Sequence, residues 1–386
     1  MKSEQNISDY WFTIEPYVYV GLTNKNALLY NTLDGVSLES DEVEVVELLR
    51  EMLQEKHCGV FLLRRERYAR KEVNDFIRNL REKFMGDVID VTLSKGKPVQ
   101  VLPFYNFSDK HDVYKKLNKF PYQSVLANMS EISIHVNNTT NVAKLIPFLQ
   151  SISGHPTFNI VGNVGNVENY SELLSFFNQH PSPKYILCSY TDVIPLQPVF
   201  ENDFSYRVSI HFPLNMQQWD RSRDILLQQS LPCEYVFDVT SEEDYLQTDR
   251  LIDSFGIEKY RINPVYTGDN ISFFEENIFL TKEDILSTSM SIKDFLIRHS
   301  INLYDFGKIN ILPNGDAYAN INHPALGNIY THSILEIVHR EMEEGKSWFR
   351  IRNYEPCNDC VYQLLCPSPS NYEIAIGRHN LCHVKQ

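Results

Sequence analysis

The sequence has few cysteines over most of its length. Three occur in the first 356 of its 386 residues, and they are far apart: Cys58, Cys188 and Cys233. Isolated cysteines in a reducing compartment are usually small buried apolar residues, so these three predict neither disulfides nor a metal site. The other four cysteines lie within the last thirty residues, which makes the C-terminus the place to look for chemistry.

Positive charge and long apolar runs are also lacking. The chain has 36 Lys and Arg against 50 Asp and Glu, a net charge of -14 and a pI near 5.3. Nucleic-acid binding depends on many Lys and Arg contacts to phosphates, so we expect no nucleic-acid partner. No apolar run approaches the roughly 18 residues of a membrane span, and the start MKSEQNISDYWF is no signal peptide. These absences predict a cytoplasmic protein without a membrane partner.

The composition is that of a globular protein, with 43% hydrophobic and 12% aromatic residues. The pattern changes along the chain and predicts three domains, at 1–120, 121–275 and 276–386. The first has short strands and two helices with apolar residues at helical spacing. Strands are expected at 17–22, within 27–40 and at 59–63, with hairpin turns at Asn24 and Asp34-Gly35, and helices are expected at 41–54 and 70–84. Gly86 lies where a helix C-terminus favours glycine.

The second segment alternates strands with helices, which predicts parallel strands joined by helical crossovers. Expected strands are 131–136, 158–163, 184–190, 206–212, 234–239 and 259–266; expected helices are 142–152, 168–180, 217–229 and 242–255. Six such units are too few for an eight-stranded barrel. The pattern fits either an open α/β sheet or a partial barrel.

Other sites have weak support in this segment. Gly162 and Gly165 follow a strand, but without a full phosphate-binding motif they predict a plain turn. Neither Ser-His-Asp nor H-E-x-x-H spacing is present. His135 and His211 lie in strand patterns, so we expect them to be buried and hydrogen-bonded.

The cysteine spacing near the C-terminus is typical of a metal site. Cys357 and Cys360 form C-x2-C, Cys366 follows after five residues, and Cys382 follows after fifteen more. Four thiolates suit either zinc or an iron-sulfur cluster, and the spacing alone leaves both open. His379 and His383 could replace a cysteine ligand, although histidines beside such motifs usually face solvent or support the ligands.

The third segment resembles the SPASM domain of peptide-modifying radical SAM maturases. The resemblance is carried by PNGDAY, LGNI, SILEI and the C-x2-C-x5-C run. It implies that the four C-terminal cysteines, Cys357, Cys360, Cys366 and Cys382, ligate one auxiliary 4Fe-4S cluster. The family's run continues with a further cysteine where this chain has Ser370, so a second auxiliary cluster is not expected.

The second segment is similar to the partial (β/α)6 barrel of radical SAM enzymes. In that family the loop after the first strand carries C-x3-C-x2-C, but here it reads NNTTNVAK. The family's Gly-Gly-Glu-Pro motif is reduced to Gly162, followed by Asn163 and Val164. The resemblance therefore implies a degenerate barrel that neither forms the radical cluster nor binds S-adenosylmethionine.

The first segment resembles the winged-helix leader-recognition domain of peptide maturases, an α+β domain. There a leader peptide adds as a strand beside the third strand and packs on the last helix. The resemblance places that contact at Val36–Glu39 and on the helix over 73–84. The expected contact residues are Val36, Ser37, Leu38, Glu39, Phe76 and Leu80. The stretch GVFLLRRERY departs from the family, because it reads as a strand with a basic tail where the family has a helix.

Taken together, the segments resemble the pseudo-radical-SAM proteins of Bacteroidales peptide-maturation systems, whose precursors have a Gly-Gly leader. The resemblance implies a noncatalytic partner of a radical SAM peptide maturase, binding the precursor peptide, the maturase or both. One 4Fe-4S cluster would hold the C-terminal domain or deliver electrons. The alternatives are a zinc-stabilised peptide-binding adaptor without a redox role and an independent metalloenzyme.

Overall fold

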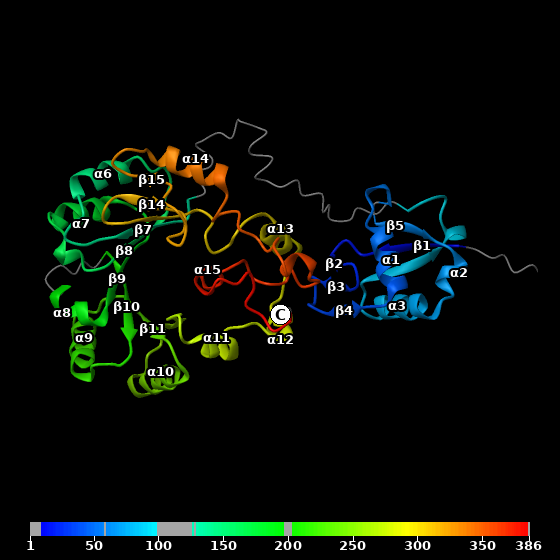
Figure 1. Ribbon diagram of the computed structural model, residues 1–386, viewed down its shortest axis with the longest axis horizontal. Coiled ribbons are helices and arrows are strands. Elements are labelled where there is room, and N and C mark those ends of the chain that lie inside the picture. Colours follow the sequence, from blue (N-terminus) through cyan, green and yellow to red (C-terminus); the bar gives the residue numbers. More distant parts are fainter. Residues whose placement is uncertain (1–8, 58, 99–125, 127–128, 197–202, 385–386) are drawn as a thin grey trace, which may run out of the picture.

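The structure is a computed structural model that describes residues 9–57, 59–98, 126, 129–196 and 203–384. Cys58 lies outside the described residues. The described strands form two three-stranded sheets near the N-terminus and one nine-stranded sheet (Figure 1). Within the described part, every helix is too short or too polar to cross a membrane.

The N-terminal segment is α+β, with two antiparallel sheets of order β5-β1-β6 and β2-β3-β4. The strands are β1 (Tyr10–Ile14), β2 (Val18–Leu22), β3 (Ala27–Asn31), β4 (Ser37–Ser40), β5 (Val60–Leu63) and β6 (Gly86–Asp90). The helices are α1 (Val43–Met52), α2 (Arg65–Tyr68) and α3 (Lys71–Glu82). The strands and helices predicted here are confirmed, and β1, β6 and the short helix α2 are additional. The winged-helix likeness stays a prediction.

Gly86 has a different role from the predicted one. Helix α3 ends at Glu82, and the residue with a left-handed backbone after it is Phe84, with φ 54°. Gly86 begins β6, where an added Cβ would lie 2.5 Å from the carbonyl oxygen of Thr13 in β1. The prediction of a helix C-terminal glycine is wrong, because the close approach of two strands is what requires glycine here.

The central segment forms a mostly parallel sheet whose first six strands follow chain order. They are β7 (Glu131–His135), β8 (Thr157–Val161), β9 (Lys184–Ser189), β10 (Ser205–His211), β11 (Cys233–Val239) and β12 (Tyr260–Pro264). The helices are α6 (Val142–Gln150), α7 (Tyr170–Gln179), α8 (Val193–Leu196), α9 (Met216–Gln228) and α10 (Glu242–Phe255). All six predicted strands and all four predicted helices are confirmed.

Consecutive strand order has a consequence for the layers. Right-handed crossovers that always step in the same direction place their helices on the same face of a sheet. Figure 1 shows α6, α7, α9 and α10 along the outer side of the strands. The fold is therefore mixed α/β with a largely parallel sheet, as predicted, and the partial barrel stays a prediction.

The C-terminal segment contributes to the same sheet. Its strands are β13 (Lys308–Ile311), β14 (Asp316–Tyr318) and β15 (Gly327–Asn328), and β13 pairs parallel with β7. Its helices are α11 (Ile271–Asn277), α12 (Lys282–Ser287), α13 (Ile292–Ser300), α14 (Ile334–Glu344) and α15 (Asn371–Ile376). The predicted turn at Pro313–Gly315 and the helix in SILEIVHRE are both confirmed. The proposed domain limits stay predictions, although the sheet crosses the limit set at residue 275.

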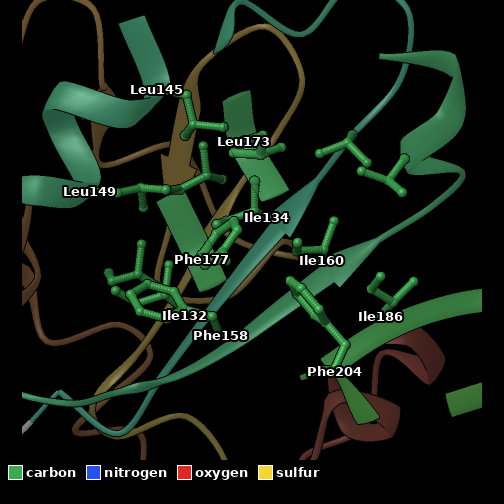
Figure 2. Close-up of a cluster of buried hydrophobic side chains, with 14 of the residues drawn as sticks. Ile132, Ile134, Leu145, Leu149, Phe158, Ile160, Leu173, Phe177, Ile186 and Phe204 are labelled. Carbon is green, nitrogen blue, oxygen red and sulfur yellow. The ribbon is translucent and has the colours of Figure 1, made fainter. Parts of the chain in front are cut away.

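The core lies between the central sheet and its helices (Figure 2). Alternate strand residues such as Ile132, Ile134 and Phe158 meet Leu149 and Phe177 from the helices. Burying a side chain of this size contributes about 1.5–3 kcal/mol. Because side chains alternate along a strand, the residues between them lie on the other side of the sheet. We call that side the polar face; it carries Ser133, Asn159, Ser189, Ser209, His211, Asp238 and Asn263.

The N-terminal segment and the C-terminal segment share a small core of their own. Tyr19 stacks on Phe295 of α13, with ring centroids 4.0 Å apart. The hydroxyl of Tyr30 donates to the carbonyl oxygen of Thr288 at 3.2 Å. An added Cβ on Gly21 would lie 2.3 Å from the carbonyl oxygen of Val361. The sheet β2-β3-β4 is therefore covered on one side by the segment that carries the cysteines.

Candidate metal centre

The four C-terminal cysteines line one small cavity. Cys357 begins the 3-10 helix Cys357–Asp359, Cys360 follows it directly, and Cys366 precedes a proline. Apolar residues, among them Leu280 from the segment before α12, complete the wall together with the polar Arg352, Gln363 and Asn380. The predicted ligand set is thus brought together by the fold, although its role as a ligand set stays a prediction.

Cys382 reaches the cavity through a short backbone pairing. It forms an isolated parallel bridge with Leu280. The amide of Leu280 donates to the carbonyl of Leu381 at 3.0 Å, and the amide of His383 donates to the carbonyl of Leu280 at 3.0 Å. This pairing fixes the fourth cysteine beside three that precede it by 16 or more positions.

Hydrogen-bond donors reach two of the sulfurs. Arg352 Nη1 lies 3.9 Å from Cys357 Sγ, and Asn380 Nδ2 lies 3.4 Å from Cys382 Sγ. Donors to metal-bound sulfur orient the ligands and shift the reduction potential of a cluster. A second guanidinium, that of Arg298, donates to the carbonyl oxygen of Leu365, next to Cys366.

Arg352 is itself held by a buried carboxylate. Its Nη2 lies 2.9 Å from Glu373 Oε1, and both side chains are more than nine-tenths buried. Burial alone would lower the pKa of Arg352, but Glu373 and nearby thiols raise it overall. The guanidinium is therefore a permanent positive charge beside the cysteines.

Burial controls the charge of the thiols. It raises the pKa of Cys366 to about 12 and raises that of Cys357 as well. Without a metal such thiols are neutral at physiological pH, and a coordinated metal removes their protons.

The arrangement bears on the choice between zinc and a cluster. In the described residues there is no group of three or more His, Cys, Asp or Glu side chains that could hold one metal ion. Zinc needs all its sulfurs about 2.3 Å from a single ion, whereas a 4Fe-4S cluster spreads four thiolates over four irons. The choice between zinc and a cluster stays a prediction.

The candidate histidine ligands are engaged elsewhere. The ring of His379 stacks on Tyr354, with centroids 5.6 Å apart. The ring of His383 contacts the carbonyl oxygen of Glu275, with Nε2 at 2.9 Å. Neither ring therefore replaces a cysteine in this arrangement.

Ser370 has a structural role at the position where the resemblance has another cysteine. It is the N-cap of α15 and forms a capping box with Glu373. The amide of Ser370 donates to Glu373 Oε2 at 2.6 Å. The same carboxylate thus caps a helix and neutralises Arg352.

A larger cavity of about 450 Å³ adjoins the cysteines. Arg352 and Cys357 line both cavities and so form the boundary between them. The volume lies in the usual range of small-molecule sites. Its other cations have carboxylate partners; Lys346 contacts Glu344, for example, with 2.9 Å between Nζ and Oε2.

The loops after β7 and β8 are ordinary βα turns. Asn141 caps α6, its side chain accepting from the amide of Lys144. Gly162 has φ 115°, and an added Cβ would lie 2.7 Å from the carbonyl oxygen of Val136. Backbone geometry is thus sufficient to explain this glycine. His135 is partly buried, and burial lowers its pKa, but His211 is half exposed, so the expectation of burial is wrong for His211.

The predicted peptide-binding residues are divided between a sheet edge and a core. Ser37, Leu38 and Glu39 lie in β4, which pairs with β3 and ends the sheet among the described strands; Val36 precedes it. Phe76 and Leu80 are buried in the N-terminal core, so their side chains face inward. This contact stays a prediction.

Glu39 has a partner in the C-terminal segment. Its Oε2 lies 2.7 Å from Nζ of Lys282, which begins α12. The sequence offered no signal for this contact, nor for Arg352, Arg298 and Asn380 beside the cysteines.

No protein-family model and no curated protein matches the chain. Among solved structures it is similar to anSMEcpe with bound AdoMet, at 13% identity and a TM-score of 0.41, over 61% of this chain and 84% of that one. The same protein with bound AdoMet and Kp18Cys peptide is similar at 10% identity and a TM-score of 0.40, over 61% of this chain and 88% of that one. E. coli MccB with succinimide is similar at 14% identity and a TM-score of 0.19, over 69% of this chain and 85% of that one.

Proposed function

We propose that the chain is a partner of a radical SAM peptide maturase that performs no radical chemistry of its own. It binds the maturase, the precursor peptide that has the Gly-Gly leader, or both. It also carries one 4Fe-4S cluster. The observation that carries the proposal is that four thiols surround one cavity while the turn after β7 contains no cysteine.

The residues around the cavity support a resident cluster. Cys357, Cys360, Cys366 and Cys382 would hold it, and Arg352 and Asn380 would donate hydrogen bonds to its thiolates. Such a cluster supplies one-electron transfer and a covalent link between distant parts of the C-terminal segment. Arg352 would offset part of the negative charge of the cluster. The role of the cluster is therefore structural or electron-delivering.

The edge of β4 supports a peptide-binding role. An exposed strand edge accepts an extended peptide through backbone hydrogen bonds, and neighbouring side chains select its sequence. The contact of Glu39 with Lys282 places this edge beside the cysteine segment. A peptide added there would lie against both ends of the chain.

The metal content is the first test. Protein purified without oxygen should contain about four irons and four sulfides per chain, as a 4Fe-4S cluster requires. Cys382→Ala should lose them, whereas Cys233→Ala, which removes a thiol from β11, should keep them. Zinc in place of iron would support the adaptor instead, for which bound metal would stabilise folding by about 10 kcal/mol.

Coexpression with the maturase and precursor tests the partnership. We expect a stable complex, and a lower yield of modified peptide when this chain is omitted. An unchanged yield without any complex would refute the proposal. Full maturase activity with a cluster-free Cys382→Ala chain would exclude electron delivery. Turnover by the isolated chain at its metal would instead indicate an independent metalloenzyme.

A further inference from the structure

A row of polar side chains crosses the polar face where four parallel strands end. Ser189 ends β9, His211 ends β10, Asp238 is the penultimate residue of β11, and Asn263 is the penultimate residue of β12. Ser189 Oγ lies 2.9 Å from His211 Nε2, and His211 Nδ1 lies 3.7 Å from Asp238 Oδ2. Asn263 Nδ2 donates to Asp238 Oδ1 at 2.7 Å.

The sheet register brings these residues together. His211 is opposite Asp238, and Asp238 is opposite Asn263, in adjacent parallel strands. Ser189 lies on the strand at the other side of β10. The carboxyl ends of parallel strands are where α/β folds commonly place their reactive groups. Half of the His211 side chain is exposed, so a small molecule can reach it.

The order of groups is that of a nucleophile, a base and an acid that orients the base. A neutral imidazole with its proton on Nδ1, toward Asp238, leaves Nε2 free to accept the Ser189 proton. The Ser189 oxygen is also fixed by its neighbour, because the amide of Thr191 donates to it at 3.2 Å. Asn263 holds the carboxylate from the far side.

We propose that Ser189, His211 and Asp238 form a second site, which hydrolyses activated acyl esters and thioesters. This goes beyond the proposed function and involves none of the residues of the metal centre. Ser189 Oγ attacks the acyl carbon while His211 Nε2 takes its proton, and the alcohol or thiol leaves with that proton. Water then attacks the acyl-serine, His211 again takes the proton, and it returns the proton to Ser189 as the acid is released. Water is the sole co-reactant, and no redox change occurs.

The distances limit the substrate. The separation of 3.7 Å between His211 Nδ1 and Asp238 is longer than a hydrogen bond, so the carboxylate orients the imidazole only loosely. A loosely oriented base suits acyl donors whose leaving group departs readily, such as aryl esters and thioesters. Peptide amides, which need stronger assistance to their leaving group, are not expected to be cleaved.

The test combines labelling with kinetics on the purified full chain. A fluorophosphonate probe should form one adduct that maps to Ser189, and p-nitrophenyl acetate should be hydrolysed. Ser189→Ala should abolish the adduct and lower the hydrolysis rate at least about 100-fold, the usual contribution of such a base and nucleophile. Ser209→Ala removes a hydroxyl from the same face, opposite Ser189 in register, and should leave both unchanged.

His211→Gln separates catalysis from folding. Ser189 caps the 3-10 helix Tyr190–Asp192, so its loss could disturb the fold, whereas His211→Gln keeps that cap. We expect His211→Gln to lose labelling and hydrolysis with an unchanged melting temperature. No adduct at Ser189, or equal hydrolysis by wild type, Ser189→Ala and His211→Gln, would refute the proposal. Either result would leave the proposed function of the metal centre unaffected.

Discussion

Glu341 makes the stability of the C-terminal segment depend on pH. This residue of α14 is 1% exposed and accepts hydrogen bonds from the amides of Ser347 at 2.8 Å and Trp348 at 2.7 Å. Burial outweighs these bonds and raises its pKa from 4.5 to about 7. The folded state therefore holds a proton that the unfolded state releases between these two pH values.

The magnitude follows from linkage. A difference of about 2.5 between the two pKa values, at 1.36 kcal/mol per unit, corresponds to about 3 kcal/mol. Because the folded pKa is raised, the contribution is fully present below pH 4.5 and is lost as pH rises through 7. Glu341→Gln keeps a neutral acceptor for both amides and has no proton to lose.

The variant should therefore gain on wild type as pH rises. Between pH 5 and pH 8 we expect its advantage in free energy of unfolding to grow by about 2 to 3 kcal/mol. Urea unfolding followed by tryptophan fluorescence measures this, with Trp348 as a nearby reporter. Glu343→Gln, an exposed change in the same helix, should follow wild type. A gap between Glu341→Gln and wild type that is equal at both pH values would refute the reasoning.

Two further predictions concern contacts near the cysteines. Gly21→Ala places a Cβ 2.3 Å from the carbonyl oxygen of Val361, so β2 and the C-terminal segment must separate, at a cost of about 1–3 kcal/mol. Thermal unfolding measures this loss, and an unchanged melting temperature would contradict the contact. Arg352→Gln leaves Glu373 as an unpaired buried charge and should cost about 3–5 kcal/mol. The double variant Arg352→Gln and Glu373→Gln should recover part of that stability in urea unfolding. No recovery would mean that the unpaired charge of Glu373 is not the cause of the loss.

Much of the fold could be predicted because its elements are locally consistent. The strands and helices from 131 to 266 alternate in a sequence whose apolar spacing matches each element. β1 and β6 were missed, and their pairing joins segments about 75 positions apart, which no local pattern reveals. Gly86 was misread for the same reason, since its strand neighbour at Thr13 is distant in sequence.

The sites divide in the same way. The cysteine cavity could be predicted because its four cysteines lie close together in the sequence. The position of Arg352 could not, because it depends on Glu373 in α15. The residues of the row that contains Ser189 and His211 do not form a recognisable sequence motif. Parallel register across four strands alone brings them together, so a search for linear motifs passes over them.

The shared core between the two ends of the chain affects how the protein is made. Tyr30 leaves the ribosome 258 residues before its partner Thr288, a delay of roughly 10 to 50 s at about 5 to 20 residues per second. During that time the side of the sheet β2-β3-β4 that carries Tyr30 is not covered by the C-terminal segment. Chaperones could bind the nascent chain there. Cys382 comes a further 94 positions after Thr288. The cavity therefore receives its fourth thiol only after the cover of this sheet has been synthesised.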